Sequence, residues 1–230
     1  MRPSTLKRWT IGLVLLALLL AVLGGLVWGG ITGWTPSRKD YPVQGLYVSA
    51  ADGDLAWPTL ATMGADFAYV RASAGGSLRD PRFAANIKGA RAAGMRYGAV
   101  HEFSLCASEE SQAQQFITTV PRDPDMLSPV VSLELSEACK NRPDRAMLLG
   151  ELNTLLNQIE NHAGKPALLR IGRDFEDAYQ VSEGLARTVW LIGDFVPPDY
   201  AAKRWVMWQS SSFYRINGAP DGVRWNVVRP

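Results

Sequence analysis

Residues 9–37 carry no charged side chain, and most of them are Leu, Val, Ala or Gly. About 20 apolar residues are enough to cross a bilayer as a helix. Three basic residues precede the run: Arg2, Lys7 and Arg8. Because basic residues favour the cytoplasmic side of a membrane, the sequence predicts a cytoplasmic N-terminus over residues 1–9. It predicts a transmembrane signal-anchor over residues 10–33.

A cleaved signal peptide is the competing interpretation of the same run. The apolar part of such a peptide spans about 7–15 residues and ends at a cleavage site of small residues. The run here is longer and offers only a poor site, which favours an uncleaved anchor. Both interpretations export a linker, 34–42, and a domain, 43–230. The domain is then expected outside the cytoplasmic membrane, in a periplasm or at the cell surface.

Strand-like and helix-like segments alternate through the exported part of the chain. The predicted strands are 45–50, 66–73, 95–103, 128–135, 166–171, 188–195 and 204–211. The predicted helices are 57–64, 81–94, 108–120 and 142–164. Such alternation is typical of an α/β protein with a parallel sheet, and this many units predict a closed barrel.

Charge and cysteine count exclude several classes of protein. The formal charge of +2 arises near the N-terminus, because residues 41–230 hold 19 basic and 21 acidic side chains. No basic surface is expected, so nucleic acid is not a predicted partner. Two cysteines and two isolated histidines do not make a zinc module, and no glycine-rich phosphate or dinucleotide motif is present. We therefore expect no metal and no cofactor.

Three segments carry a family resemblance when they are taken together. They read GLYVSAADGDLAWPTL, FAYVRASAGGSLRDPRFAANIKGARAAGMRYGAVHEFSLC and TVPRDPDMLSPVVSLE, the last followed by CKNRPDRAMLL. With the ending WVMWQSSSF…VRWNVV, they resemble the glycoside hydrolase family 25 lysozymes over roughly residues 43–230. Those enzymes are muramidases that cut the glycan strand of peptidoglycan on an irregular β/α barrel. The resemblance implies an irregular TIM-like β/α barrel and peptidoglycan as the partner.

Four places that carry an acid in the family pattern hold another residue here. Tyr47 stands at the Asp of Gly-Ile-Asp-Val-Ser, Ala74 at the Glu of Thr-Glu-Gly, and Ser132 at the Asp of Asp-x-Glu. Arg224 stands where the family usually has an Asp before x-Asn. Glu134 keeps the Glu of Asp-x-Glu, so the resemblance makes Glu134 the candidate proton donor.

The lost acids matter because of the chemistry of glycoside cleavage. That reaction needs one group to protonate the leaving oxygen and a second to stabilise the cationic centre. Residues i and i+2 of a strand point the same way, so Asp-x-Glu aims two carboxylates into one cleft. Ser132 supplies no negative charge, and Arg224 near the cleft lowers the pKa of Glu134, the wrong direction for a general acid. We therefore expect impaired catalysis, with glycan binding outlasting turnover.

Glu102 is the candidate substitute acid. It lies two residues after Val100 on the predicted third strand, and it forms a new pair with Glu134 if its side chain enters the cleft. A solvated, outward-facing Glu102 is the alternative. Asp52 and Asp54 flank a glycine, where a role in a turn is expected.

Several side chains have two open interpretations, a contact with the sugar or a place in the barrel core. The candidates for substrate binding are His101, Trp208, Gln209 and Tyr69. Alternation along a strand places an aromatic residue in the core as readily as in a groove. The sequence alone leaves both interpretations open.

Cys106 and Cys139 are predicted to form a disulfide. They follow the ends of the third and fourth predicted strands, and neighbouring barrel strands bring such ends together. Some family 25 members have cysteines at both places. An exported domain also meets an oxidising compartment, where disulfides persist.

The combined prediction is a membrane-anchored, family 25 lysozyme-like domain that acts on or binds peptidoglycan glycan strands. The alternatives are a catalytically inactive glycan-binding or scaffolding protein of the cell envelope, and an enzyme with a changed substrate that uses Glu102. The positions of Glu102 and Arg224 relative to Glu134 distinguish these possibilities.

Overall fold

A computed structural model describes residues 5–230, with side chains from residue 9 onward. The chain divides into two compact units, Met1–Trp34 and Thr35–Pro230. Arg2 and the first part of the predicted cytoplasmic segment 1–9 lie outside the described residues. Each unit is described by itself.

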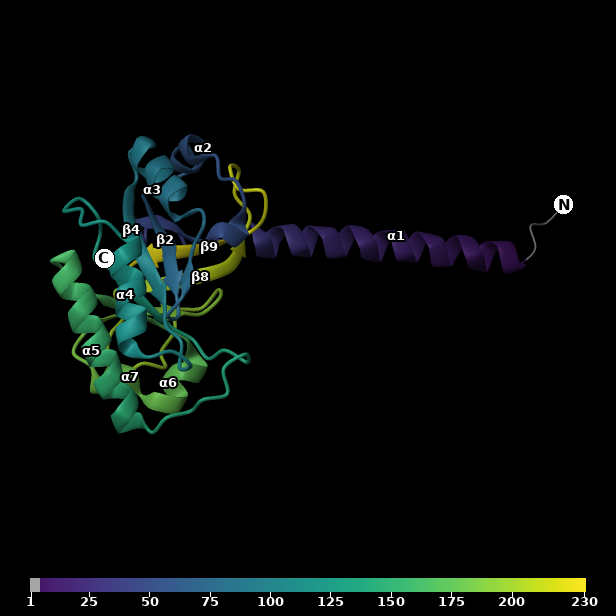
Figure 1. Cartoon of the computed structure of the whole chain (residues 1–230). Coiled ribbons are helices and arrows are strands. Elements are labelled where there is room, and N and C mark those ends of the chain that lie inside the picture. Colours follow the sequence, from purple (N-terminus) through teal and green to yellow (C-terminus); the bar gives the residue numbers. More distant parts are fainter. Residues whose placement is uncertain (1–4) are drawn as a thin grey trace. The chain divides into compact units, whose positions relative to one another are not determined.

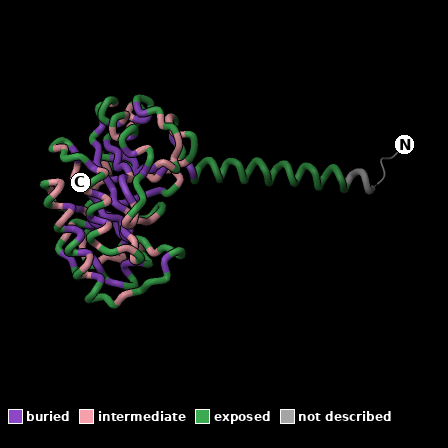
Figure 2. The backbone as a smooth tube through the Cα atoms, viewed as in Figure 1, coloured by how far each residue is buried: buried purple, intermediate pink, exposed green. Residues whose placement is uncertain are grey.

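The first unit is the helix α1, Thr5–Thr32. Its stretch Trp9–Thr32 is long and apolar enough to cross a membrane, with a mean hydropathy of 2.7. Figure 2 shows this helix exposed along nearly all of its described length. A signal sequence passes the same test of length and composition, so the helix fits a membrane anchor or a signal.

The second unit is built on a closed barrel of eight strands (Figure 1). In barrel order they are β1 (Gln44–Val48), β9 (Val223–Val228), β8 (Met207–Tyr214), β7 (Thr188–Ile192), β6 (Leu168–Ile171), β5 (Val130–Leu133), β4 (Arg96–Glu102) and β2 (Phe67–Ala74). β1 pairs with β2 and closes the ring. β9 runs antiparallel to both of its neighbours, which makes the barrel irregular. The short strand β3 (Leu78–Arg79) forms a hairpin with β2. The predicted fold class is confirmed.

Helices follow most of the parallel strands. They are η1 (Ala50–Asp52), α2 (Trp57–Thr62), α3 (Phe83–Ala92), α4 (Glu109–Thr119), α5 (Arg145–Ala163), α6 (Arg173–Tyr179) and α7 (Val181–Gly184). Ser108 and Asp144 cap α4 and α5 by accepting a hydrogen bond from the third helical N–H, and Gly164 ends α5 in the left-handed conformation. Figure 1 shows α3, α4 and α5 outside the barrel strands. The short helices α6 and α7 are absent from the sequence-based prediction.

The barrel interior has an apolar layer and a polar layer above it. The apolar layer is a buried cluster: Tyr47, Phe67, Tyr69, Val100, Val130, Trp190 and Met207. Leu168 of β6 is partly buried and packs against this cluster. Two residues after Val100, Val130, Leu168 and Met207 come Glu102, Ser132, Arg170 and Gln209. Because successive even positions of a strand share a face, these polar side chains form the next layer toward the carboxyl ends of the strands. In a β/α barrel that end carries the functional site.

Candidate active site

A pocket of about 320 Å³ opens at the carboxyl ends of β2, β4 and β5. The lining residues from the hairpin of β2 and β3 are Ala74, Gly75 and Leu78. The remaining lining residues are Glu102, Phe103, Ser104, Leu105, Glu134, Ser136 and Cys139. Two carboxylates, Glu102 and Glu134, therefore share one pocket, and they are the charged groups among the described residues that line it.

Glu134 lies directly after β5, with 52% of its side chain exposed. Its Oε1 accepts a hydrogen bond from the Ser132 hydroxyl at 3.2 Å and another from the Arg170 guanidinium. Gly172, just past β6, leaves room for this arrangement, since a Cβ there would lie 3.3 Å from Glu134 Cγ. The acid predicted from the sequence is thus in the pocket, but it is already engaged.

Arg170 is the site residue that the sequence reasoning missed. It lies on β6 in register with Ser132, and its side chain is 2% exposed. Its Nη1 also donates to Ser132 Oγ at 2.7 Å, and its Nη2 donates to Gln209 Oε1 at 2.6 Å. Its guanidinium carbon lies 4.9 Å from the centre of the Tyr47 ring. A charged residue inside the otherwise apolar strand Leu-Leu-Arg-Ile was the available signal.

The surroundings of Glu134 set its charge. Burial alone raises its pKa, but the charge and hydrogen bond of Arg170, the hydrogen bond of Ser132 and the charge of Arg224 lower it. The net effect is a pKa below the ordinary value of a glutamate. Glu134 is therefore ionised at neutral pH, and an ionised carboxylate has no proton to give to a leaving group.

Glu102 enters the pocket with its own set of partners. Its Oε1 accepts a hydrogen bond from the Tyr47 hydroxyl at 2.7 Å, and its Oε2 pairs with Arg71 Nη1 at 3.1 Å. Arg71 also binds Asp80 at 2.9 Å. Burial, then the charge of Glu102, raises the pKa of Tyr47 above that of a free phenol, so its hydroxyl stays protonated and donates. The Glu102 side chain lines the pocket, so the outward-facing alternative does not describe its position.

Arg224 does not line the pocket, and its contacts are with Asp52, Ser49 and Tyr47. Its Nη2 pairs with Asp52 Oδ2 at 3.1 Å and lies 3.3 Å from Ser49 Oγ. Its guanidinium carbon sits 3.9 Å from the centre of the Tyr47 ring. Arg224 does lower the pKa of Glu134, but it is the smallest of the contributions. The cation that controls Glu134 is Arg170, which corrects the sequence-based emphasis on Arg224.

Asp52 and Asp54 stay outside the pocket. Asp52 accepts the Ser49 backbone N–H at 2.7 Å and so closes a capping box around η1. Asp54 is exposed and forms an ion pair with Arg82. These contacts give both aspartates structural roles around the turn at Gly53.

The four predicted sugar contacts are buried and lie away from the pocket lining: His101, Tyr69, Trp208 and Gln209. The Tyr69 hydroxyl donates to Ser128 O at 3.2 Å, and Trp208 Nε1 donates to Gly193 O. Gln209 accepts from Arg170, as described above. Buried side chains with internal partners do not reach a glycan in this conformation, so the core interpretation describes their positions.

His101 is a neutral core histidine. Its Nδ1 lies 2.9 Å from Ser73 Oγ, and its Nε2 lies 3.2 Å from Gln112 Oε1. The Gln112 oxygen also accepts from Ser104 N, which fixes it as an acceptor, so Nε2 carries the proton. Burial lowers the pKa of His101 to about 4.

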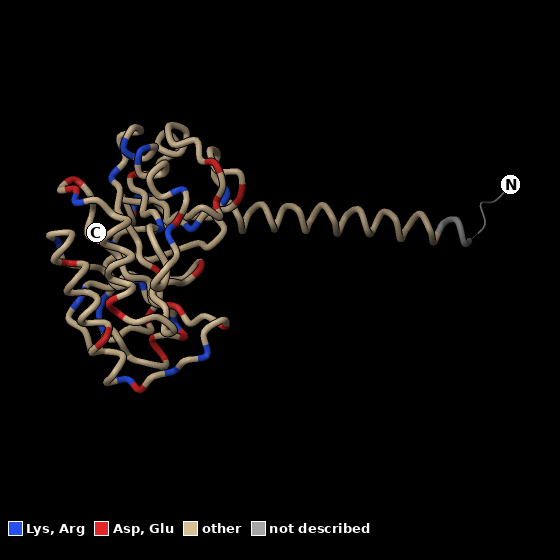
Figure 3. The backbone as a smooth tube through the Cα atoms, in the orientation of Figure 1, with Lys and Arg blue, Asp and Glu red and all other residues tan. Residues whose placement is uncertain are grey.

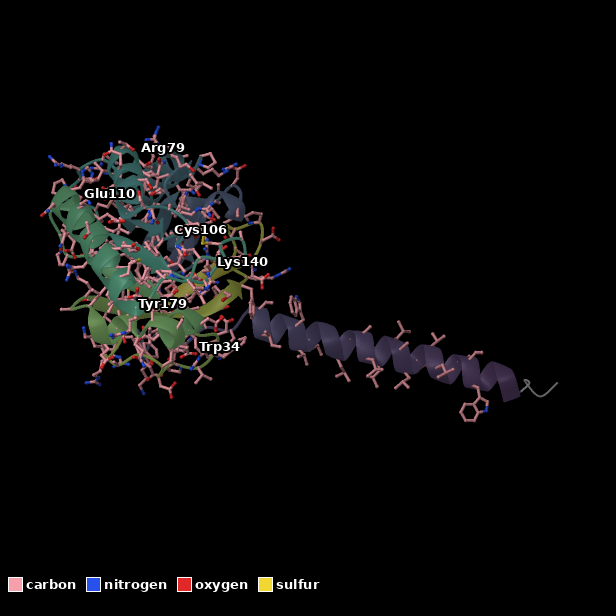
Figure 4. All side chains as sticks on the ribbon, turned by 60° about the horizontal axis from the view of Figure 1, so that its bottom comes forward. Trp34, Arg79, Cys106, Glu110, Lys140 and Tyr179 are labelled. Carbon is pink, nitrogen blue, oxygen red and sulfur yellow. A yellow bond between two sulfur atoms is a disulfide. The ribbon has the colours of Figure 1, made fainter. Side chains whose placement is uncertain are left out.

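Cys106 and Cys139 are joined by a disulfide, which links the loop after β4 to the loop after β5 (Cys106 is labelled in Figure 4). The Asn141 amide adds a hydrogen bond to Leu105 O at 2.7 Å between the same two loops. Both loops contribute pocket residues, so these ties hold two walls of the pocket together.

Metal ligands are not gathered anywhere in the described part of the chain, where no group of three or more His, Cys, Asp or Glu side chains could hold an ion. Figure 3 shows acidic and basic residues interspersed over the barrel unit rather than collected into one basic face.

A closed β/α barrel with carboxylates at the carboxyl ends of its strands is an arrangement typical of barrel enzymes. Residues 47–219 match the family described as glycosyl hydrolases family 25. This match spans most of the chain, which belongs to that family. The second unit is therefore a family 25 lysozyme-like domain.

Individual proteins are similar to this chain over most of its length. The uncharacterized protein YegX of Escherichia coli is 25% identical over 194 residues, covering 81% of this chain and 70% of YegX. A family 25 glycosyl hydrolase from Bacillus anthracis has a TM-score of 0.78 at 27% identity, covering 86% of this chain and 92% of that one. A bacterial lysozyme from Streptomyces coelicolor shares the fold, with a TM-score of 0.74 at 24% identity over 82% of this chain and 92% of its own.

Proposed function

We propose that this protein is a membrane-anchored family 25 domain that binds peptidoglycan glycan strands outside the cytoplasm and cleaves them far more slowly than an intact family site. One observation carries the proposal. The retained acid, Glu134, is bonded to the buried cation Arg170, and a serine stands two residues before it where the family pattern has an aspartate.

The slow turnover follows from the two demands of glycoside cleavage. A general acid must carry a proton at the working pH, whereas Arg170 favours the ionised form of Glu134. A second group must stabilise the developing positive charge, and Ser132 brings a hydroxyl that Arg170 already engages. Loss of such electrostatic stabilisation typically costs about 100- to 1000-fold in rate.

Glycan binding does not depend on these proton transfers. The pocket stays open at the carboxyl ends of the strands, with apolar walls from Phe103 and Leu105 and polar groups from both glutamates. Pockets with mostly apolar walls and a few placed polar groups are typical of small-molecule sites.

Sedimentation with insoluble peptidoglycan tests the binding half of the proposal. The full-length protein in detergent micelles is expected to pellet with purified cell-wall sacculi, and Ser136→Trp, which fills the pocket, is expected to abolish pelleting. Glu137→Trp places the same bulk on an exposed position of the same loop that does not line the pocket, and it serves as the matched control. Equal pelleting of the two variants contradicts binding in this pocket.

The anchor is tested by fractionation. The proposal places residues 10–33 in the cytoplasmic membrane, supported by the apolar stretch Trp9–Thr32 and the basic flank before it. The protein is expected to stay with membranes after an alkaline carbonate wash. N-terminal sequencing of a mature form that begins near Thr35 would show a cleaved signal instead.

A second candidate function is an active glycosidase with a changed acid pair. The observation that favours it is that Glu102 and Glu134 line one pocket. Under this candidate, Glu102→Gln abolishes glycan cleavage. Under the main proposal, the slow cleavage that remains is changed less than about threefold by Glu102→Gln.

A further inference from the structure

The charges around the pocket are distributed unevenly. The two glutamates line it, whereas the cations that bind them approach from the barrel interior and do not line it. Arg170 is buried, and Arg71 has 21% of its side chain exposed and is shared between Glu102 and Asp80. A ligand entering the pocket therefore meets negative charge first.

Oε2 of Glu134 is available to accept a hydrogen bond from a ligand in the pocket. Ser132 and Arg170 both donate to Oε1, and within the described part of the chain no side chain or backbone N–H donates to Oε2. Half of this side chain is exposed, and the carboxylate is ionised at neutral pH. An ionised oxygen without an internal donor, in a pocket, is an acceptor for a ligand.

The walls of the pocket strengthen such a contact. Leu78, Phe103, Leu105 and the disulfide at Cys139 form apolar walls beside the carboxylates. Coulomb attraction grows as the surrounding dielectric falls. A cationic group is favoured over a neutral donor, because a hydrogen bond between two charged groups is roughly twice as strong as one between neutral groups.

We propose that this pocket binds a protonated primary amine, and that the amine is an unacetylated amino group on a sugar of the glycan strand. This inference rests on the proposed function, because it names which glycans the same pocket prefers. The ammonium group bonds to Glu134 Oε2, with Glu102 adding negative charge beside it. An acetylated amino group offers only one neutral N–H and loses the charge.

Calorimetric titration of the full-length protein in detergent micelles tests the inference. The probes are a glucosamine tetramer and an N-acetylglucosamine tetramer at pH 6, with lysine amide as a primary amine from a non-sugar source. The glucosamine tetramer is expected to bind at least about tenfold more tightly than the other two. The advantage of the glucosamine tetramer is expected to vanish by pH 9.5, because even an amine with the pKa of an α-amino group, about 8, has lost its proton there.

Variants locate the contact. Glu134→Gln keeps the oxygen that Arg170 binds but removes the charge, and it is expected to weaken glucosamine binding about tenfold and to weaken binding of the acetylated tetramer less. Glu137→Gln removes a charge from the same loop outside the pocket and is expected to change neither. Comparing the ligands on the unmodified protein needs no variant, so a folding defect does not obscure the result.

The outcomes separate this inference from the proposed function. Equal binding of both tetramers overturns the amine preference and leaves the glycan-binding function intact. Tighter binding of lysine amide than of the glucosamine tetramer overturns the sugar as the source of the amine. Failure of both tetramers to bind overturns glycan binding in the pocket and the inference with it.

Discussion

Arg170, with 2% of its side chain exposed, holds the carboxylate of Glu134, which is 52% exposed, from inside the barrel. Arg170 lies on β6, and Glu134 directly follows the neighbouring parallel strand β5, where Ser132, two positions before the acid, is in register with Arg170. A cation buried behind a cleft acid keeps that acid ionised. A neutral hydrogen-bonding residue behind Glu134 would orient it as a proton donor. Arg170, which stands there instead, favours the form of Glu134 that has lost its proton.

The ion pair between Glu134 and Arg170 predicts that the stability cost of removing Glu134 depends on whether Arg170 is present. Glu134→Ala leaves a buried guanidinium without its charge partner, and we expect a loss of about 2 kcal/mol, below the value for a fully buried pair because Glu134 is half exposed. In an Arg170→Met background, Glu134→Ala is expected to cost less than about 0.5 kcal/mol. Urea unfolding of the four proteins in this double-mutant cycle measures the difference, and additive effects would contradict the coupling.

Restoring the aspartate of the family pattern is expected to recover little activity by itself. Ser132→Asp places a carboxylate where Arg170 Nη1 already bonds, so the new acid pairs with the same cation. Adding Arg170→Met to Ser132→Asp is expected to raise glycan cleavage at least about tenfold, and more than adding Arg224→Asp does. Cleavage rates on the same sacculi compare the variants, and a larger gain from Arg224→Asp would restore Arg224 as the controlling cation.

The lowered pKa of the buried His101 predicts that the protein loses stability in acid. Its pKa is about 4 in the folded protein and about 6.5 in an unfolded chain, so between these values only the unfolded state binds the proton. The free energy of unfolding should therefore fall as the pH drops from about 6.5 to about 4, by up to roughly 3 kcal/mol, and this contribution should level off below pH 4.

Two variants isolate that contribution. His101→Gln is expected to flatten the pH dependence between pH 6.5 and 4, whatever its effect on stability at pH 7. His162→Gln removes the other histidine, whose Nε2 contacts Val120 O, and it should keep the original slope. Equal slopes for all three proteins in denaturant titrations would rule out His101 as the source.

The disulfide is expected to stabilise the barrel unit and the pocket walls. Cys106 and Cys139 are separated by 33 positions, and closing a loop of this size is worth roughly 3–4 kcal/mol in the chain-entropy model. Labelling of the unfolded, unreduced protein should detect no free thiol. Reduction with dithiothreitol should lower the midpoint of thermal unfolding, and an unchanged midpoint would contradict a stabilising role.

The sequence predicted the barrel because its signals are local. Most strands contain a short apolar run bounded by turn residues, and α5 shows both of its caps, Asp144 and Gly164, in the sequence. β9, with the sequence VRWNVV, was not among the predicted strands. The helices α6 and α7 escaped prediction because they are short and rich in acidic and polar residues, with few apolar positions to show a period. Their place is set by contacts such as Ser182 with Glu176, which the sequence does not reveal.

The sequence pointed to Glu134 and Glu102, which line the pocket, but it missed Arg170 and the pairings among the charged groups. The family pattern located Glu134, and strand alternation allowed Glu102 to enter the pocket. Which cation reaches which carboxylate depends on register between strands: Arg170 lies beside Ser132 because β5 and β6 align them, whereas Arg224 is drawn to Asp52. The sequence feature that indicates Arg170 is its place as a charged residue in the apolar strand β6.

Muropeptide release from purified sacculi by the full-length protein tests the central claim most directly. With Glu134 held ionised by Arg170 and Ser132 in place of an acid, we expect a rate at least about 100-fold below that of an intact family 25 lysozyme under the same conditions. Glu134→Gln should then change the slow rate only slightly. A rate within tenfold of the intact enzyme, lost on Glu134→Gln, would contradict the account and make Glu134 a working proton donor.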